Sequence, residues 1–237
     1  MQTVLDNFFA EHQNKKYQLE INKAATADWI LTGSHIPYLP LYLESVPYDE
    51  MLSEAQTLDD LYVQHRSNDS LGWSSLCIHG ITSQHTDHYA VYPEYADLTN
   101  DTVPYGWTEI QDRCPVTTNF FKHHFPFDVY HRVRFMRLDP GGYILPHSDS
   151  PDLGLRAVNI SLNNPIGCDF VFENIGTVPF TSTGSMFLVA NGYRHSVWNR
   201  SDQTRYHIIV HGYATTQPYY DLVTKSYNTL IPSIFDI

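Results

Sequence analysis

The second half of the chain alternates apolar and polar residues in short runs. From residue 129 onward, segments rich in β-branched and aromatic residues follow one another: VYHRVRFMRL, YIL, RAVNISL, CDFVFEN, SMFLVA, HSVWN and RYHIIVHGY. The stretches between them are rich in turn residues: DPGG, NNPIG, NIGT, STGS, ANG and NRSDQ. Many short strands separated by Gly, Pro and Asn turns predict an all-β sandwich or barrel.

The first half has a more mixed pattern, with polar loops. One strand is predicted at 74–81 (SSLCIHGI), and residues 108–125 carry apolar positions near helical spacing, where Pro115 should break or kink the helix. No linker rich in Pro, Gly or Ser separates the halves, so we predict one domain over residues 1–237. Its expected parts are an N-terminal elaboration with helices (1–125), a β core that carries the functional site (126–214) and a C-terminal tail (215–237).

Composition and charge narrow the class of protein. Of the 237 residues, 42% are hydrophobic and 17% are charged, which is enough apolar material for a sizeable core. The formal net charge of −12 argues against broad nucleic-acid binding, which needs clustered Lys and Arg, but it leaves room for a local basic pocket. No apolar stretch approaches the roughly 18 residues of a membrane span, so we expect neither nucleic acid nor membrane as a partner.

The cysteines indicate the redox compartment. Cys77, Cys114 and Cys168 are odd in number and widely spaced, so they predict neither a zinc site nor a disulfide framework. A reducing compartment is the default for such a chain. The N-terminal residues also lack the positive start and long apolar run of a secretory signal, and we therefore expect a cytoplasmic protein.

Candidate chemistry gathers at residues 145–162, LPHSDSPDLGLRAVNISL. His147 and Asp149 stand two apart, and on their own they could be a polar loop with a turn-capping acid. A second imidazole, His195, begins the apolar segment HSVWN. Two imidazoles and one carboxylate form the facial triad that holds non-haem Fe(II) and leaves positions open. The sequence therefore offers His147, Asp149 and His195 as candidate iron ligands.

Two arginines accompany these residues. Arg205 follows His195 by ten residues across the turn-like NRSDQT, which predicts an antiparallel hairpin that brings the two together. An arginine there can bind a carboxylate through two hydrogen bonds. Strand alternation in RAVNISL places Arg156 with the apolar, inward-facing positions. A buried guanidinium needs an anion, which could be a protein carboxylate or a ligand.

The segment from about Val133 to His211 resembles the aspartyl/asparaginyl β-hydroxylase family. The resemblance rests on the PG turn, the PH before the acid, LR followed by an alternating strand, GC, H-x-V-W and the arginine ten positions after the histidine. It implies a mainly β fold, a double-stranded β-helix (jelly roll, cupin-like) with an N-terminal mixed α/β elaboration. It also implies Fe(II) as the metal, 2-oxoglutarate as co-substrate and O₂.

The resemblance also assigns roles to individual residues. His147 and His195 match the metal-binding histidines of the family. Arg205 matches the arginine that binds 2-oxoglutarate, and Arg156 matches a second arginine near that co-substrate. We therefore predict His147, Asp149 and His195 as metal-binding and catalytic residues, and Arg156 and Arg205 as co-substrate-binding residues.

The chain departs from the animal members of the family at three positions. Those members have glycine where this chain has Asp149, a serine at the position of Met136 and a histidine at the position of Val158. The triad is complete here, as in bacterial relatives that hydroxylate free amino acids such as proline. The two other departures imply that the anion site is lined differently.

The sequence thus predicts a 2-oxoglutarate-dependent dioxygenase that hydroxylates an unactivated C–H bond of an amino acid or amino-acid-like substrate, with release of succinate and CO₂. The substrate would be a small molecule or a peptide. Two alternatives remain open. One is a cupin-type metalloenzyme that does not use 2-oxoglutarate, and the other is a non-catalytic β-sandwich binding module.

Overall fold

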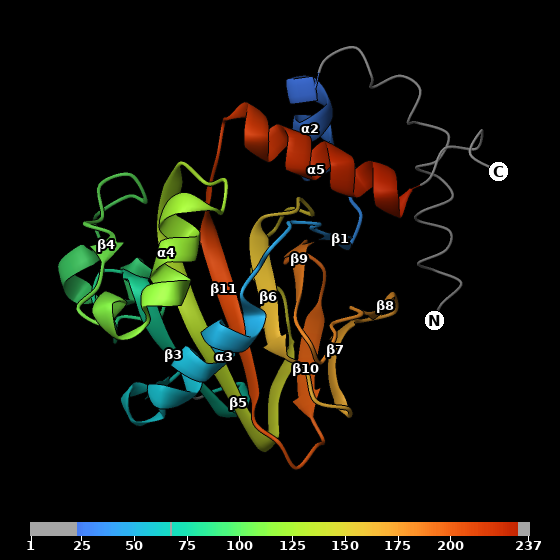
Figure 1. Ribbon diagram of the computed structural model, residues 1–237. Coiled ribbons are helices and arrows are strands. Elements are labelled where there is room, and N and C mark those ends of the chain that lie inside the picture. The colour runs from blue at the N-terminus through green and yellow to red at the C-terminus, as the bar shows by residue number, and fades with distance from the viewer. Residues whose placement is uncertain (1–22, 67, 232–237) are drawn as a thin grey trace.

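A computed structural model describes residues 23–66 and 68–231 of the chain, and its described part is mainly β (Figure 1). The strands are β1 (Tyr38–Pro40), β2 (Val63–Gln64), β3 (Ser70–Gly80), β4 (Gly106–Trp107), β5 (Val129–His147), β6 (Ala157–Asn163), β7 (Cys168–Phe172), β8 (Gly176–Thr177), β9 (Ser185–Val189), β10 (His195–Asn199) and β11 (Arg205–Tyr213). The helices are α2 (Lys23–Thr32), α3 (Tyr48–Thr57), α4 (Pro115–His123) and α5 (Gln217–Leu230), and short 3-10 turns lie at Asp59–Leu61, Tyr89–Val91, Pro93–Tyr95 and Gln111–Arg113.

The strands form a curled antiparallel sheet in the order β1-β9-β6-β11-β5-β10-β7-β8, with β3 also paired to β5. The long strand β5 belongs to both layers of this roll. Its first part pairs with β11 up to Leu138, and its last part pairs with β10 from Tyr143 to His147. The predicted jelly roll is therefore confirmed, and β5 is the strand through which its two layers are joined.

Two local predictions at this junction are wrong. DPGG does not separate two strands, because β5 runs through it; Gly141 (φ 73°) supplies the backbone conformation needed where the strand passes between layers. The segments HSVWN and RYHIIVHGY do not pair as a hairpin either. β5 lies between β10 and β11 in the strand order, so the turn after Asn199 crosses from one layer to the other.

Helices cover one outer face of the roll and create a second core. The strand β6 is buried along almost its whole length because its two faces contact different cores. Val158 and Ile160 belong to the core shared with the helices, while Ala157 belongs to the core inside the roll. Helices α2 and α5 lie side by side (Figure 1), and α3 contacts β6.

The predicted helix within residues 108–125 is confirmed, but it is shorter. Helix α4 begins at Pro115, a position where the missing N–H of proline costs no hydrogen bond. The carboxylate of Glu54 accepts hydrogen bonds from the backbone N–H groups of Val116 (2.7 Å) and Thr117 (2.9 Å), which would otherwise be unpaired at the start of the helix. Proline therefore starts this helix and does not kink it.

The predicted C-terminal tail contains helix α5, which the sequence reading missed. Its buried residues recur at helical spacing: Tyr219, Leu222, Val223, Ser226 and Tyr227. No helix among residues 23–66 and 68–231 combines the length and apolar character needed to cross a membrane.

Phe135 tests the importance of the outer core, which is the core that the sheet shares with the helices. It is fully buried on β5, between Leu76 of β3 and Ile208 of β11 in the strand register. We expect Phe135→Ala to lower the free energy of unfolding by about 3–5 kcal/mol, because it leaves a cavity between three strands. Urea unfolding measures this. Ile166→Ala is the control, since that side chain is 98% exposed and its removal should change stability little. Equal effects of the two substitutions would contradict this packing.

Candidate active site

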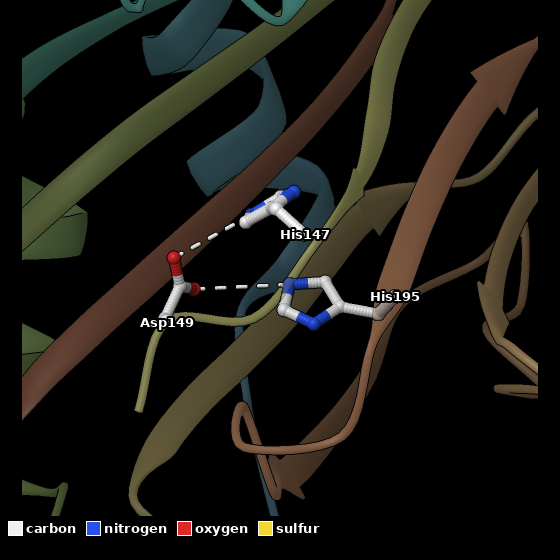
Figure 2. A group of neighbouring side chains, drawn as sticks. All are labelled: His147, Asp149 and His195. Atoms are coloured by element: carbon white, nitrogen blue, oxygen red, sulfur yellow. Dashed lines mark ion pairs between the residues drawn. The ribbon is translucent and has the colours of Figure 1, made fainter. Parts of the chain in front are cut away.

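Three of the predicted residues meet where β5 ends and β10 begins. His147 is the last residue of β5, His195 is the first of β10, and the two stand opposite each other in the antiparallel register. Asp149 follows two residues later, and its carboxylate lies beside both rings, with one oxygen facing each of them (Figure 2). Strand pairing thus converts the sequence separation of 48 residues into direct proximity.

The loop that carries Asp149 is held against the turn before β10. The backbone N–H of Asp149 donates to the carbonyl oxygen of Asn191 at 3.0 Å. Gly192 in the same turn has no room for a side chain, because a Cβ there would lie 1.7 Å from the carbonyl oxygen of Asp152. The close approach of these two segments fixes where the carboxylate stands.

The ligand atoms are spaced for a single metal ion. Nε2 of His147 lies 3.4 Å from Oδ1 of Asp149, and Nε2 of His195 lies 3.7 Å from Oδ2. One ligand atom from each residue lies within 4.8 Å of the other two. Two atoms that share an ion at about 2.1 Å can be no more than roughly 4.2 Å apart, so both histidine–carboxylate separations fit.

Hydrogen bonds donated to backbone carbonyls orient both imidazoles for metal binding. Nδ1 of His147 is 2.8 Å from the carbonyl oxygen of Leu145, and Nδ1 of His195 is 2.8 Å from that of Tyr193. Only a protonated ring nitrogen can donate to a carbonyl, so each Nδ1 carries the hydrogen. Each Nε2 then presents a lone pair to the site, as a metal ligand requires.

The surroundings of His195 and Asp149 also favour the ligand protonation states. At His147, burial alone would lower the pKa, but the contacts with Asp149 and a backbone carbonyl raise it, so a metal ion would have to displace that proton. His195 is buried and stacks on Phe170 with ring centroids 5.1 Å apart; this burial lowers the pKa of the imidazole and keeps it neutral. Burial opposes ionisation of Asp149, but the neighbouring imidazoles and the Arg66 guanidinium outweigh it and lower the pKa of the carboxyl. A neutral imidazole and an ionised carboxylate are the forms that bind metal. The donor set fits Fe(II).

Arg205 lies in the same cavity as the triad, a space of about 440 Å³. Its side chain is buried, and no carboxylate among the described residues forms an ion pair with it. Its guanidinium is held by neutral groups instead, His207 Nδ1 at 2.8 Å and Asn164 Oδ1 at 3.3 Å. Burial lowers the pKa of Arg205 to about 10, so it stays cationic at neutral pH. This is a preformed receptor for an anionic group.

The structure contradicts the predicted inward placement of Arg156. Its side chain is 61% exposed, and its guanidinium binds Asp152 through Nε (2.9 Å) and Nη2 (2.6 Å). It precedes β6 and does not line the cavity. Strand β6 is buried on both faces, so the more apolar face is not necessarily the one that lines the cavity. Ala157 and Asn159 line the cavity, whereas Val158 faces the helices. The protein-carboxylate alternative is the one observed, although at the surface.

Other cavity-lining cations were missed by the sequence reading. Arg66 binds Asp149 directly, with 2.9 Å between Nη2 and Oδ1, and Arg132 and Arg134 line the cavity from β5. A signal for the last two was present, since alternate residues of a strand share a face and VYHRVRFMRL carries both on one side. Arg66 gave no signal, because 83 residues separate it from its partner.

Comparisons with solved structures find 2-oxoglutarate oxygenases. A prolyl-4-hydroxylase from Pseudomonas putida is 13% identical, with a TM-score of 0.42, over 81% of this chain and 99% of that chain. A prolyl hydroxylase from Trichoplax adhaerens, solved with a hypoxia inducible factor peptide fragment, is 10% identical, with a TM-score of 0.48, over 83% and 92%. An oxidoreductase of the 2OG-Fe(II) oxygenase family from Burkholderia pseudomallei is 12% identical, with a TM-score of 0.42, over 83% and 94%.

Sequence comparison is more decisive for the family. No curated protein matches the chain in sequence. The family model of the aspartyl/asparaginyl β-hydroxylases, however, matches residues 48–214, which is well over half of the chain and includes the triad and Arg205. The protein therefore belongs to the aspartyl/asparaginyl β-hydroxylase family and is a 2-oxoglutarate-dependent hydroxylase that uses Fe(II) and O₂.

Proposed function

We propose that this hydroxylase acts on an unactivated C–H bond of a free amino acid or an amino-acid-like molecule and releases succinate and CO₂. The observation that carries the proposal is one cavity that contains both the His147–Asp149–His195 cluster and the buried, carboxylate-free Arg205. Its volume of about 440 Å³ lies within the range of small-molecule sites, roughly 300–1,000 Å³.

Different residues of the site would hold the iron, orient the co-substrate and limit the access of water. When bound, the iron supplies the O₂ chemistry that no side chain can perform. His147, His195 and Asp149 would hold it on one side and leave its other positions toward the cavity. Arg205 would bind and orient the distal carboxylate of 2-oxoglutarate through its planar guanidinium. Met136, Ile144, Phe170 and Val197 give the cavity an apolar wall that limits water.

The alternatives fit the site less well. A cupin-type enzyme without 2-oxoglutarate has no use for a buried arginine that lacks a carboxylate partner, because such a group costs free energy unless a ligand anion meets it. A binding module without catalysis does not need two imidazoles whose Nδ1 atoms are both fixed by backbone carbonyls. Both features favour a metal-dependent oxygenase that takes an anionic co-substrate.

Turnover of 2-oxoglutarate provides the direct test. With Fe(II), 2-oxoglutarate, O₂ and ascorbate, we expect the protein to form succinate even before its substrate is known, since such oxygenases turn over slowly without one. His195→Ala is the blank, because it removes a ligand. Amino acids and peptides are then screened for a mass gain of one oxygen atom. Succinate formation no greater than in His195→Ala, with and without the screened compounds, would refute the proposal.

Asp149→Gly tests whether the acid is a metal ligand. The substitution recreates the two-histidine arrangement of the animal family members. We expect the protein to fold, to bind Fe(II) roughly tenfold more weakly or worse, and to lose most hydroxylation, because an ionised donor is lost from the site. Isothermal titration with Fe(II) under anaerobic conditions measures the affinity. Near-native affinity and hydroxylation would mean that Asp149 is a loop residue and that two protein ligands suffice.

Arg205→Ala tests the co-substrate site. We expect a loss in 2-oxoglutarate affinity of roughly tenfold or more with a much smaller change in iron affinity, since a charge-assisted pair is removed while all three metal ligands are kept. Arg156→Leu is the matched control, because it removes a guanidinium that binds Asp152 at the surface. Titration of both variants with 2-oxoglutarate in the presence of Mn(II) distinguishes them. A loss in Arg156→Leu as large as in Arg205→Ala would mean that Arg156 does take part in binding 2-oxoglutarate.

A further inference from the structure

The cavity has a second cationic end, distant from Arg205. Arg134 stands opposite Ile209 in the pairing of β5 with β11, and Arg132 stands opposite His211. Arg205 pairs with Leu138 at the other end of the same ladder. Ile209 lies four positions further along β11 than Arg205, which is roughly 13 Å of strand. Arg132 and Arg134 share the inward face of β5, and both line the cavity.

Arg134 has hydrogen-bonding capacity that the protein does not use. Its side chain is 95% buried, and its Nη1 donates to the carbonyl oxygen of Thr86 at 2.6 Å. Its Nε is buried and has no hydrogen-bond partner, and no carboxylate among the described residues lies within 4 Å of the guanidinium. Burying such a cation is costly unless an anion and further acceptors meet it.

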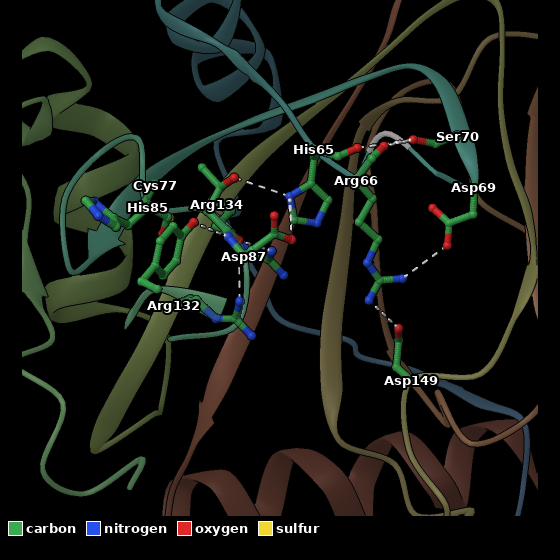
Figure 3. A network of polar contacts seen from close by, with 12 residues as sticks. His65, Arg66, Asp69, Ser70, Cys77, His85, Asp87, Arg132, Arg134 and Asp149 are labelled. Atoms are coloured by element: carbon green, nitrogen blue, oxygen red, sulfur yellow. Dashed lines mark hydrogen bonds and ion pairs between the residues drawn. The ribbon is translucent and has the colours of Figure 1, made fainter. Parts of the chain in front are cut away.

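The two acids of the cavity lining form no ion pair with Arg132 or Arg134. Asp149 binds Arg66 and belongs to the metal site, and Asp87 lies 3.5 Å from Nδ1 of His65 (Figure 3). His65 and His211 do not add to the positive charge of the cavity. Burial, followed by the charges of the nearby arginines, lowers the pKa of His65 to about 2 and that of His211 well below its ordinary value.

A comparison of charges then shows what the cavity lacks. Four arginines line it, against two carboxylates, Asp87 and Asp149. Fe(II) adds two positive charges, and 2-oxoglutarate brings two negative charges that cancel them. The lining therefore keeps an excess of two positive charges after both have bound. Arg66 is already paired with Asp149, and Arg205 would bind 2-oxoglutarate, so the arginines left without an anion are Arg132 and Arg134.

We infer that the substrate is itself an anion and that its carboxylate binds Arg134, with Arg132 beside it, at the end of the cavity opposite Arg205. The inference rests on the proposed function and specifies its substrate class: a small molecule with a free carboxylate, such as a free amino acid. A residue inside a peptide has no main-chain carboxylate to offer. Trp73 and Ile144, which also line the cavity, would contact the apolar part of the substrate.

The first test compares free acids with their neutral counterparts. The protein is loaded with Mn(II) and saturating 2-oxoglutarate, so that ligands bind without turnover. Free L-amino acids and the corresponding carboxamides are titrated calorimetrically. We expect binding among the free acids and a loss of roughly tenfold or more in the matching carboxamides. Equal binding of an acid and its amide, or binding by no free acid of the panel, would overturn the inference.

The second test locates the carboxylate. Arg134→Gln and Arg132→Gln are expected to weaken the acid found in the first test by roughly tenfold or more. Their effect on 2-oxoglutarate should be much smaller than that of Arg205→Ala. Arg137→Gln is the matched control, because Arg137 lies on the same strand but pairs with Asp139 on its outer side, at 2.9 Å. A larger effect of Arg134→Gln on 2-oxoglutarate than on the acid would assign this end to the co-substrate and refute the inference.

Two features keep these outcomes interpretable. Arg132 is only partly buried, so Arg132→Gln carries the test should the thermal midpoint show that Arg134→Gln does not fold. Arg134→Lys, which keeps the charge but not the planar fork, should bind the acid better than Arg134→Gln. The titrations do not depend on turnover, so a failure here is distinct from a failure of succinate formation with Fe(II), which would remove the proposed function itself.

Discussion

The sharing of one strand by two layers is the constraint on which the site depends. The first part of β5 pairs with β11, and its last part pairs with β10. The same strand therefore places Arg134 in the wall of the cavity and His147 at the metal site. Side chains alternate along a strand, so a slip of one residue in the β5–β11 register would turn Arg134 outward and Phe135 into the cavity. The fully buried Phe135 opposes that slip, because its burial in the outer core would be lost.

The passage of β5 between layers also shows what local sequence can and cannot predict. The alternation in VYHRVRFMRL and RYHIIVHGY was sufficient to predict strands, because period-two burial is a local property. DPGG was read as a turn for equally local reasons, since Pro and Gly favour turns. Whether such residues reverse a chain or bend one strand depends on what pairs on each side. Here β11 and β10 pair before and after the bend, and neither is near it in sequence.

The metal ligands and Arg205 could be predicted because they follow a recognisable motif in the sequence. His147 and Asp149 stand two apart, the facial-triad pattern pointed to His195, and the spacing from His195 pointed to Arg205. The family resemblance matched His147, His195 and Arg205 to their roles. The placement of Arg156 failed because parity identifies two faces but not which one lines the cavity, and both faces of β6 are buried. Arg66 could not be found at all, since its contact with Asp149 exists only once β2, β3 and β5 have assembled. Helix α5 was overlooked although its burial follows a helical period.

The charge of the whole chain gives little guide to the charge of its site. A formal net charge of −12 coexists with a cavity lined by four of the chain's 14 Lys and Arg residues. Two of these four, Arg134 and Arg205, are at least 95% buried and have no carboxylate partner among residues 23–66 and 68–231. Each costs desolvation free energy that the folded chain alone does not recover. An anion that binds at either end forms the missing ion pair. The same ion pair therefore offsets the desolvation cost of the buried arginine and provides affinity for the ligand. Two such positions in one cavity would allow an enzyme to hold a dicarboxylate co-substrate and a carboxylate substrate at the same time.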